Sequence, residues 1–105
     1  MTLEITSRHF SPSSKLKELI RKKVSRIDRF NNQVTNCHVI LTKANESENA
    51  EIKTRVKGKE FIGTDNAKFF EKSVTGAVDK VIIQLKKHRD KTFGKVKKHY
   101  NTNLQ

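Results

Sequence analysis

The chain has 105 residues, 33% of them hydrophobic and 32% charged, with 23 lysines and arginines against 11 acidic residues and a formal net charge of +12. This length suits one domain with a modest core and excludes a second one, and the single cysteine excludes an internal disulfide. No stretch is apolar enough for a signal peptide or a membrane span, so we expect a cytoplasmic protein without a membrane partner.

The N-terminal third predicts a short strand followed by a helix. Leu3 and Ile5 alternate with polar neighbours, which is typical of a half-buried strand. Ser11 followed by Pro12 predicts a helix N-cap with proline at the first helical position. Apolar residues then recur at helical spacing until two asparagines end the helix. These apolar positions are Leu16, Leu19, Ile20, Val24, Ile27 and Phe30.

Three strands are predicted in the middle of the chain. Residues 35–42 are rich in β-branched and apolar side chains and predict a central strand. A polar turn at residues 44–49 leads into residues 50–57, where apolar and polar side chains alternate clearly. Residues 57–59 (KGK) predict a tight turn into a fourth strand over residues 60–64.

A second helix is predicted after the last strand. Asp65 or Asn66 is expected to be its N-cap, and Thr92 and Gly94 are expected to end it. Residues 93–105 then form a short basic tail that we expect to be flexible. The apolar positions of this helix are Phe70, Val74, Ala77, Val78, Val81, Ile82 and Leu85.

The predicted order of elements, β-α-β-β-β-α, indicates an α+β fold. A strand, a crossover helix and a second strand in one sheet favour a right-handed parallel connection, and the hairpins that follow are antiparallel. We therefore expect a two-layer domain over residues 1–92, in which two helices cover one face of a four-stranded mixed sheet.

The positive charge is concentrated in the two predicted helices. Residues 15–29 hold seven basic against two acidic residues, and residues 80–99 hold eight against one. These two excesses equal the whole net charge, so the rest of the chain sums to zero. A compact domain with such a distribution is suited to a polyanion, and nucleic acid is the partner that we expect.

Helical geometry predicts basic flanks on both helices. On the first helix Lys15, Lys22, Arg26 and Arg29 share one flank, with Lys23 at the edge of the apolar stripe. On the second helix Lys80, Gln84, Lys87 and Lys91 form a row. We expect the two rows to make a continuous basic surface or groove across the neighbouring helices. The alternative is that these lysines only solvate the helices.

Two stretches resemble the ribosome hibernation promoting factor and ribosome-associated inhibitor family. They are residues 38–43 (HVILTK) and, in the last helix, residues 78–80 (VDK) with residues 84–91 (QLKKHRDK). The resemblance covers about residues 1–92. It implies a fold like the double-stranded-RNA-binding domain with an added strand. It also implies a protein that occupies the small ribosomal subunit where mRNA and tRNAs lie, and that silences translation in stressed or stationary bacteria.

The resemblance also implies which residues face rRNA. It places Lys17, Lys23, Arg26, Lys80, Gln84, Lys87 and Lys91 at basic contact positions. The chain departs from the family where Asp-Met-Tyr usually opens the last helix, since residues 68–70 are KFF, and at Ile83, which replaces a usual arginine. Lys86 or Arg89 is expected to supply the missing contact. The full set of candidate rRNA-binding residues is Lys17, Lys22, Lys23, Arg26, Arg29, Lys80, Gln84, Lys86, Lys87, Arg89 and Lys91.

The short basic tail indicates the short promoting factor, which in that family favours pairing of inactive ribosomes. The expected partners are thus the small ribosomal subunit with its rRNA and intact ribosomes, and the free protein is expected to be a monomer. Steep weakening of ribosome binding by salt is expected from several phosphate contacts. Changing Lys80, Lys87 and Lys91 together to Glu is expected to abolish binding while the fold survives.

Three other function classes compete with this one. An enzyme is disfavoured because His9, His38, His88 and His99 are scattered without metal-ligand spacing and no phosphate-cradling glycine loop is present. We expect no catalytic activity, no metal and no cofactor. A general double-stranded-RNA-binding domain would use similar lysines and stays open. So does a protein-interaction module that modulates a sigma factor.

Overall fold

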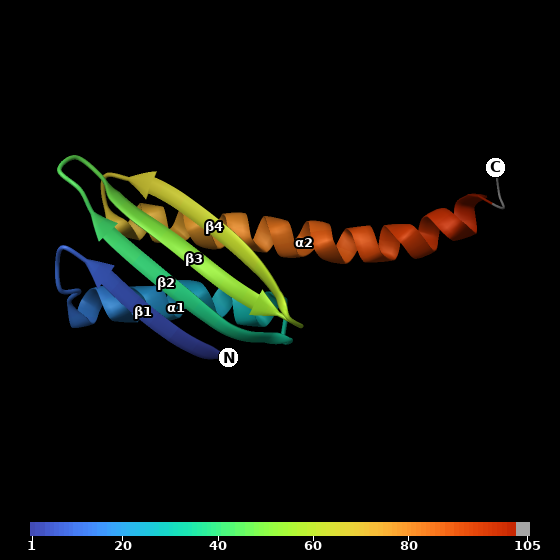
Figure 1. Ribbon diagram of the computed structural model, residues 1–105, viewed down its shortest axis with the longest axis horizontal. Helices are drawn as coiled ribbons and strands as arrows, with labels where there is room; N and C mark the ends of the chain where they lie inside the picture. Colours follow the sequence, from blue (N-terminus) through green and yellow to red (C-terminus); the bar gives the residue numbers. More distant parts are fainter. Residues whose placement is uncertain (103–105) are drawn as a thin grey trace.

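The computed structural model describes the backbone of residues 1–102 and the side chains of residues 1–89. Four strands and two helices follow one another in the predicted order, and the fold class is confirmed (Figure 1). The elements are β1 (Thr2–Arg8), α1 (Ser14–Phe30), β2 (Val34–Lys43), β3 (Glu48–Val56), β4 (Lys59–Ala67) and α2 (Phe70–Thr102).

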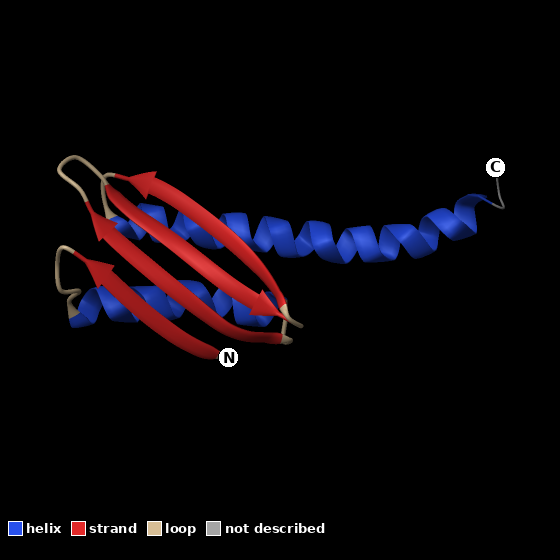
Figure 2. Cartoon of the chain, in the orientation of Figure 1, coloured by secondary structure: helices blue, strands red, loops and turns tan. Residues whose placement is uncertain are grey.

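The strands form one mixed sheet in the order β1-β2-β3-β4. β1 runs parallel to β2, as the crossover through α1 requires, and the remaining pairs are antiparallel. Both helices pack on the same face of this sheet, with α1 behind β1 and β2 and α2 behind β3 and β4 (Figures 1 and 2). The last part of α2 extends past the end of the sheet, which leaves that part of the helix without a strand beneath it (Figure 1).

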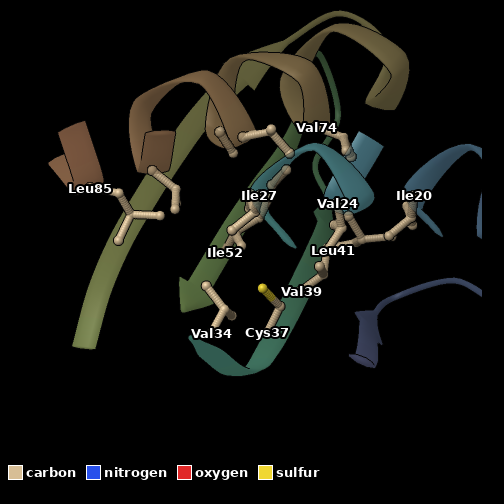
Figure 3. Close-up of a cluster of buried hydrophobic side chains, with 14 of the residues drawn as sticks. Ile20, Val24, Ile27, Val34, Cys37, Val39, Leu41, Ile52, Val74 and Leu85 are labelled. Atoms are coloured by element: carbon tan, nitrogen blue, oxygen red, sulfur yellow. The ribbon is translucent and has the colours of Figure 1, made fainter. Parts of the chain in front are cut away.

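The core lies between the sheet and the two helices. Ile20, Val24 and Ile27 come from α1, and their side chains are fully buried. They pack against the inward face of the sheet, where Val39 and Ile52 are also fully buried (Figure 3). Leu85 is the last buried residue of α2 among the described side chains, so the core ends where the helix leaves the sheet. Burial of these side chains, each contributing about 1.5–3 kcal/mol, is what holds the two layers together.

A glycine in β4 sets how closely α2 approaches the sheet. A Cβ atom at Gly63 would clash with the carbonyl oxygen of Ala77 and lie 2.9 Å from Cγ2 of Val81. The backbone of α2 therefore rests directly on the backbone of β4. Gly76 leaves space in the same way, because the carboxylate of Asp65 occupies the position where its Cβ would be. These two contacts set how α2 lies on the sheet, and with it the direction of the described cations of that helix.

Three predicted helix boundaries are wrong. Helix α1 is capped by Ser13, whose Oγ accepts the Leu16 N–H at 3.1 Å, and neither Ser11 nor Pro12 belongs to the helix. Of the two serines that follow Pro12, Ser13 has the extended backbone and the N3 hydrogen bond that define an N-cap.

Helix α2 begins later and ends later than predicted. Asp65 and Asn66 do not cap it, because the ladder with β3 continues through both residues to Ala67. The N–H of Phe70 is instead accepted by Glu48 Oε1 at 2.7 Å, a side chain at the start of β3. The helix does not end at Thr92 or Gly94 but continues to Thr102. A single glycine costs a helix only about 1 kcal/mol. The flexibility predicted for residues 93–105 stays a prediction, and residues 103–105 lie outside the described backbone.

The cap assignment gives a direct test. Replacing Ser13 by Ala removes the only side-chain acceptor found at the N-terminus of α1 among the described residues, and should lower the free energy of unfolding by about 1 kcal/mol. Ser11→Ala is the matched control and should change it by a few tenths of a kcal/mol at most. Urea denaturation followed by circular dichroism measures both. A larger loss from the Ser11 variant would restore the cap expected from the sequence.

Candidate nucleic-acid interface

One member of the basic flank of α1, Arg26, contacts α2, whereas Lys15, Lys22 and Arg29 are exposed. The guanidinium of Arg26 donates to Asp79 Oδ1 at 2.9 Å, and this ion pair joins the two helices across their shared groove. Both side chains are partly exposed, so the pair adds only about 0–1 kcal/mol to stability. The ion pair matters more for RNA recognition, because Asp79 already balances the charge of Arg26, one of the predicted contact residues.

Lys80 and Gln84 lie on the opposite flank of α2. The ammonium of Lys80 donates to the carbonyl oxygen of Thr64 at 2.7 Å and lies 3.5 Å from Oδ1 of Asp65. The amide of Gln84 donates to the carbonyl oxygen of Ile62. Both side chains thus cover outward-facing carbonyl groups of β4, which is an edge strand. Covering such an edge discourages pairing with another chain. These two residues therefore have a structural role whether or not they also contact RNA.

The two predicted basic rows do not share one groove. Asp79 and Lys80 are adjacent in sequence and therefore about 100° apart around α2, so the first faces α1 and the second faces β4. The solvent-facing side of α2 separates these two flanks. Ile83, on the same helix, is 52% exposed. The single continuous groove expected from the sequence is replaced by separate basic surfaces on either side of α2.

One of these surfaces forms where α1 ends and α2 passes the end of the sheet. The guanidinium carbon of Arg89 lies 4.9 Å from the ring centre of Phe30, the last residue of α1, which brings the two helix ends together. Arg29, Lys86 and Lys87 are exposed next to these two positions in the sequence. We call these four cations, Arg29, Lys86, Lys87 and Arg89, the helix-end basic surface. Arg89 is held by its contact with the Phe30 ring, which orients the guanidinium.

The remaining candidate residues divide into two groups. Lys17, Lys22 and Lys23 are on α1 and take part in none of the ion pairs found among the described residues. Lys17 and Lys22 are exposed, and Lys23 is half-buried. Lys91 lies outside the described side chains, so its contact with RNA stays a prediction.

Two of the histidines and the cysteine have structural partners. Nε2 of His38 lies 2.7 Å from the Thr6 hydroxyl, and the His88 ring packs edge-on against Phe61 with ring centres 5.4 Å apart. Burial raises the pKa of the Cys37 thiol, although the hydrogen bond between the thiol and the Thr54 hydroxyl opposes this effect, so a reactive thiolate is disfavoured. Among residues whose side chains are described, no three histidine, cysteine or acidic groups gather as metal ligands.

Comparisons with known proteins agree on one family. The sequence pattern of the family described as Sigma 54 modulation protein / S30EA ribosomal protein matches residues 3–92. The chain is similar to proteins named ribosome hibernation promoting factor from Klebsiella oxytoca and Escherichia coli K12. It is 23% identical to each over 91 residues, which are 87% of this chain and 96% of theirs.

Two solved structures have the same fold. A ribosomal subunit interface protein from Coxiella burnetii superposes with a TM-score of 0.79 at 22% identity, covering 85% of this chain and 98% of that one. The N-terminal domain of Protein Y from Thermus thermophilus gives 0.75 at 21% identity, covering 84% and 99%. Within the described part of the chain, neither helix is both long and apolar enough for a bilayer crossing.

Proposed function

The chain belongs to the Sigma 54 modulation protein / S30EA ribosomal protein family, and from this membership we propose that it is a ribosome hibernation factor. It binds the small ribosomal subunit through rRNA in the channel that mRNA and tRNAs use. Binding there inhibits translation and stabilises inactive ribosomes under stress or in stationary phase. The names of the similar proteins, ribosome hibernation promoting factor and ribosomal subunit interface protein, support this proposal.

The observation that carries the proposal is the helix-end basic surface. Its four cations lie near the end of α1 and in the part of α2 that follows the last buried residue, and Arg89 joins the two helices through the Phe30 ring. A strongly basic protein attracts RNA at long range, and fixed cations then contact phosphates without reading bases. Phe61 and Phe30 are occupied by packing against His88 and Arg89, so they do not serve as platforms for stacked bases.

The inhibition that follows is steric and not chemical. A bound domain in the channel excludes mRNA and tRNA by occupying their space, and this requires no catalytic group, metal or cofactor. The free protein acts as a monomer in the cytoplasm, with the small subunit and intact ribosomes as its partners. Whether it joins ribosomes into dimers depends on contacts beyond the domain itself, and the short basic segment 93–105 is the part that we propose for this role.

Sedimentation through a sucrose gradient tests the proposal. Protein added to ribosomes at low salt should move with small subunits and intact ribosomes, and the same mixture should lose translation activity. Raising the salt should release it steeply, as expected when several phosphates are neutralised. A peak of ribosome dimers would support the role of the tail. Protein that stays at the top of the gradient at low salt would overturn the proposal.

A control with free nucleic acid separates ribosome binding from general RNA binding. Unrelated RNA duplexes added in excess should not displace the protein from ribosomes. Displacement by any duplex would identify a general RNA-binding domain instead. Retention on a polymerase or sigma factor after nuclease treatment would identify the protein-interaction class.

A further inference from the structure

A hollow of about 400 Å³ lies beside the helix-end basic surface. It is lined by the connection between α1 and β2, by the end of β3 with the hairpin turn into β4, and by α2. Among the residues whose side chains are described, its charged and polar lining consists of two lysines, an arginine, a histidine and two amide side chains, and includes no acid. These residues are Asn31, Gln33, Lys57, Lys59, His88 and Arg89.

The two lysines are held on a rigid turn. Lys57 and Gly58 are the two residues between β3 and β4, and both have positive φ angles, 49° and 78°. This is the backbone of a type I′ hairpin turn, whose twist matches that of the strands it joins. Lys59 directly follows and pairs with Val56 across the hairpin. The cations are therefore presented by a fixed backbone and not by a mobile loop.

The other walls of the hollow are also held in place. Arg89 packs on the Phe30 ring and His88 packs on the Phe61 ring. Asn31 Oδ1 accepts the N–H of Gln33 at 2.9 Å, which turns the chain between α1 and β2. Because the carbonyl end of the Asn31 amide is used in this way, its NH₂ group is the end left to donate to a ligand.

The other large hollows differ in charge. The one beside the first turns of α2, about 620 Å³, contains Asp65, Glu71 and Asp79 against a single lysine, Lys72. A third, also about 620 Å³, combines two lysines with two glutamates. The acids of the hollow beside the first turns of α2 repel an anion. The balanced charges of the third hollow attract an anion only weakly. Judged by the described side chains, the hollow at the hairpin turn is the one of these three that has cations and no acid in its lining.

We infer that the hollow at the hairpin turn is a phosphate-binding site, and that its ligand is the backbone of structured RNA. Lysine and arginine side chains with amide donors are the groups that hold phosphates in proteins. The site adjoins the helix-end basic surface through Arg89, so a strand of RNA that contacts that surface continues into it. This inference rests on the proposed function, since it adds a second group of contacts to the same RNA.

The test removes the two lysine charges and keeps the turn. Lys57→Asn suits the positive φ angle, because asparagine adopts it readily and Asn-Gly favours a type I′ turn, and Lys59→Gln removes the second charge. The matched control is Lys43→Gln with Lys68→Gln, two exposed lysines at the other end of the sheet. Both double variants lower the net charge by the same amount. Affinity for ribosomes and for an RNA hairpin is measured over a salt series.

The hollow variant should bind ribosomes and the hairpin about tenfold more weakly, and the slope of log affinity against log salt should fall by about 1 to 2. The control should keep the slope of the unchanged protein. Equal effects in both variants would mean that only overall charge matters, and would overturn the inference while leaving ribosome binding intact.

A second measurement does not depend on ribosomes. Titration of the unchanged protein with pyrophosphate, followed by NMR, should shift the backbone amides of residues 31, 33 and 57–59 before those of the control lysines. Absence of such shifts would overturn the site even if ribosomes bind. A mononucleotide that binds as tightly as the hairpin would identify a free nucleotide as the ligand and overturn the RNA assignment. If ribosome binding fails but these shifts occur, the proposed function is wrong and the phosphate site stands.

Discussion

Changing Arg29, Lys86 and Lys87 together to Gln is expected to weaken ribosome binding on the order of 100-fold, because each loses a charge-assisted contact with phosphate. All three are exposed members of the helix-end basic surface and none lies in the core. The slope of log affinity against log salt should become shallower by about 2 to 3. Arg89 is left unchanged, since its removal would also lose packing on Phe30.

The structure changes which variant tests the interface. The set expected from the sequence was Lys80, Lys87 and Lys91 changed to Glu. Lys80 also ties α2 to β4 and lies beside Asp65, so a glutamate there would place two carboxylates together and weaken the fold. The matched control for the new set is Lys43, Arg55 and Lys68 changed to Gln. Co-sedimentation, with thermal unfolding as a check on folding, measures both. Equal binding by the two sets would show that the helix ends are not the interface.

Replacing Gly63 by Ala is expected to lower the free energy of unfolding by about 2–3 kcal/mol, which for a domain of this size lowers the melting temperature by roughly 10 °C or more. The added methyl group would meet the Ala77 carbonyl oxygen and approach Val81 N to 3.1 Å. Backbone atoms cannot turn aside as a side chain can, so α2 would have to move off β4.

Gly58→Asn is the control for that variant. Gly58 has a positive φ angle of 78°, but no other group lies within 4 Å of the place that a Cβ atom would take, and asparagine tolerates this backbone. Its effect should be a few tenths of a kcal/mol. Urea denaturation compares the two variants. If Gly63→Ala is within about 0.5 kcal/mol of the unchanged protein, then α2 does not rest on β4 as closely as described.

Local sequence patterns were sufficient to predict the fold class. The alternation of residues 50–57 and the helical spacing of the apolar residues of α1 are periodic signals that depend only on neighbours along the chain. The ends of the helices and strands were harder to predict from the sequence. The start of α2 depends on Glu48, a residue far away in the sequence that accepts the Phe70 N–H, and nothing near Phe70 reveals it.

The candidate site was only partly predictable for the same reason. Helical geometry placed Arg26 and Lys80 on basic flanks. It did not reveal that Asp79 pairs with Arg26 or that Asp65 lies beside Lys80, because these acids fall outside the basic segments. A zero net charge over the remaining residues also concealed Lys57 and Lys59. The hairpin places them at one end of β3, whereas the acidic turn with Glu46 lies at the other end.

The sequence by itself determined the number, type and order of the elements and the two helices that hold the excess charge, because periodicity and composition are properties of short segments. Only the tertiary structure decided which cations lie together. Arg26 pairs with Asp79 across the two helices, and Lys57 and Lys59 of the hairpin line one hollow with Arg89 of α2, because the packing of α2 on Gly63 sets the direction of that helix. Charge can be counted along a chain, but a binding surface depends on distances between segments, and those arise only when the layers pack.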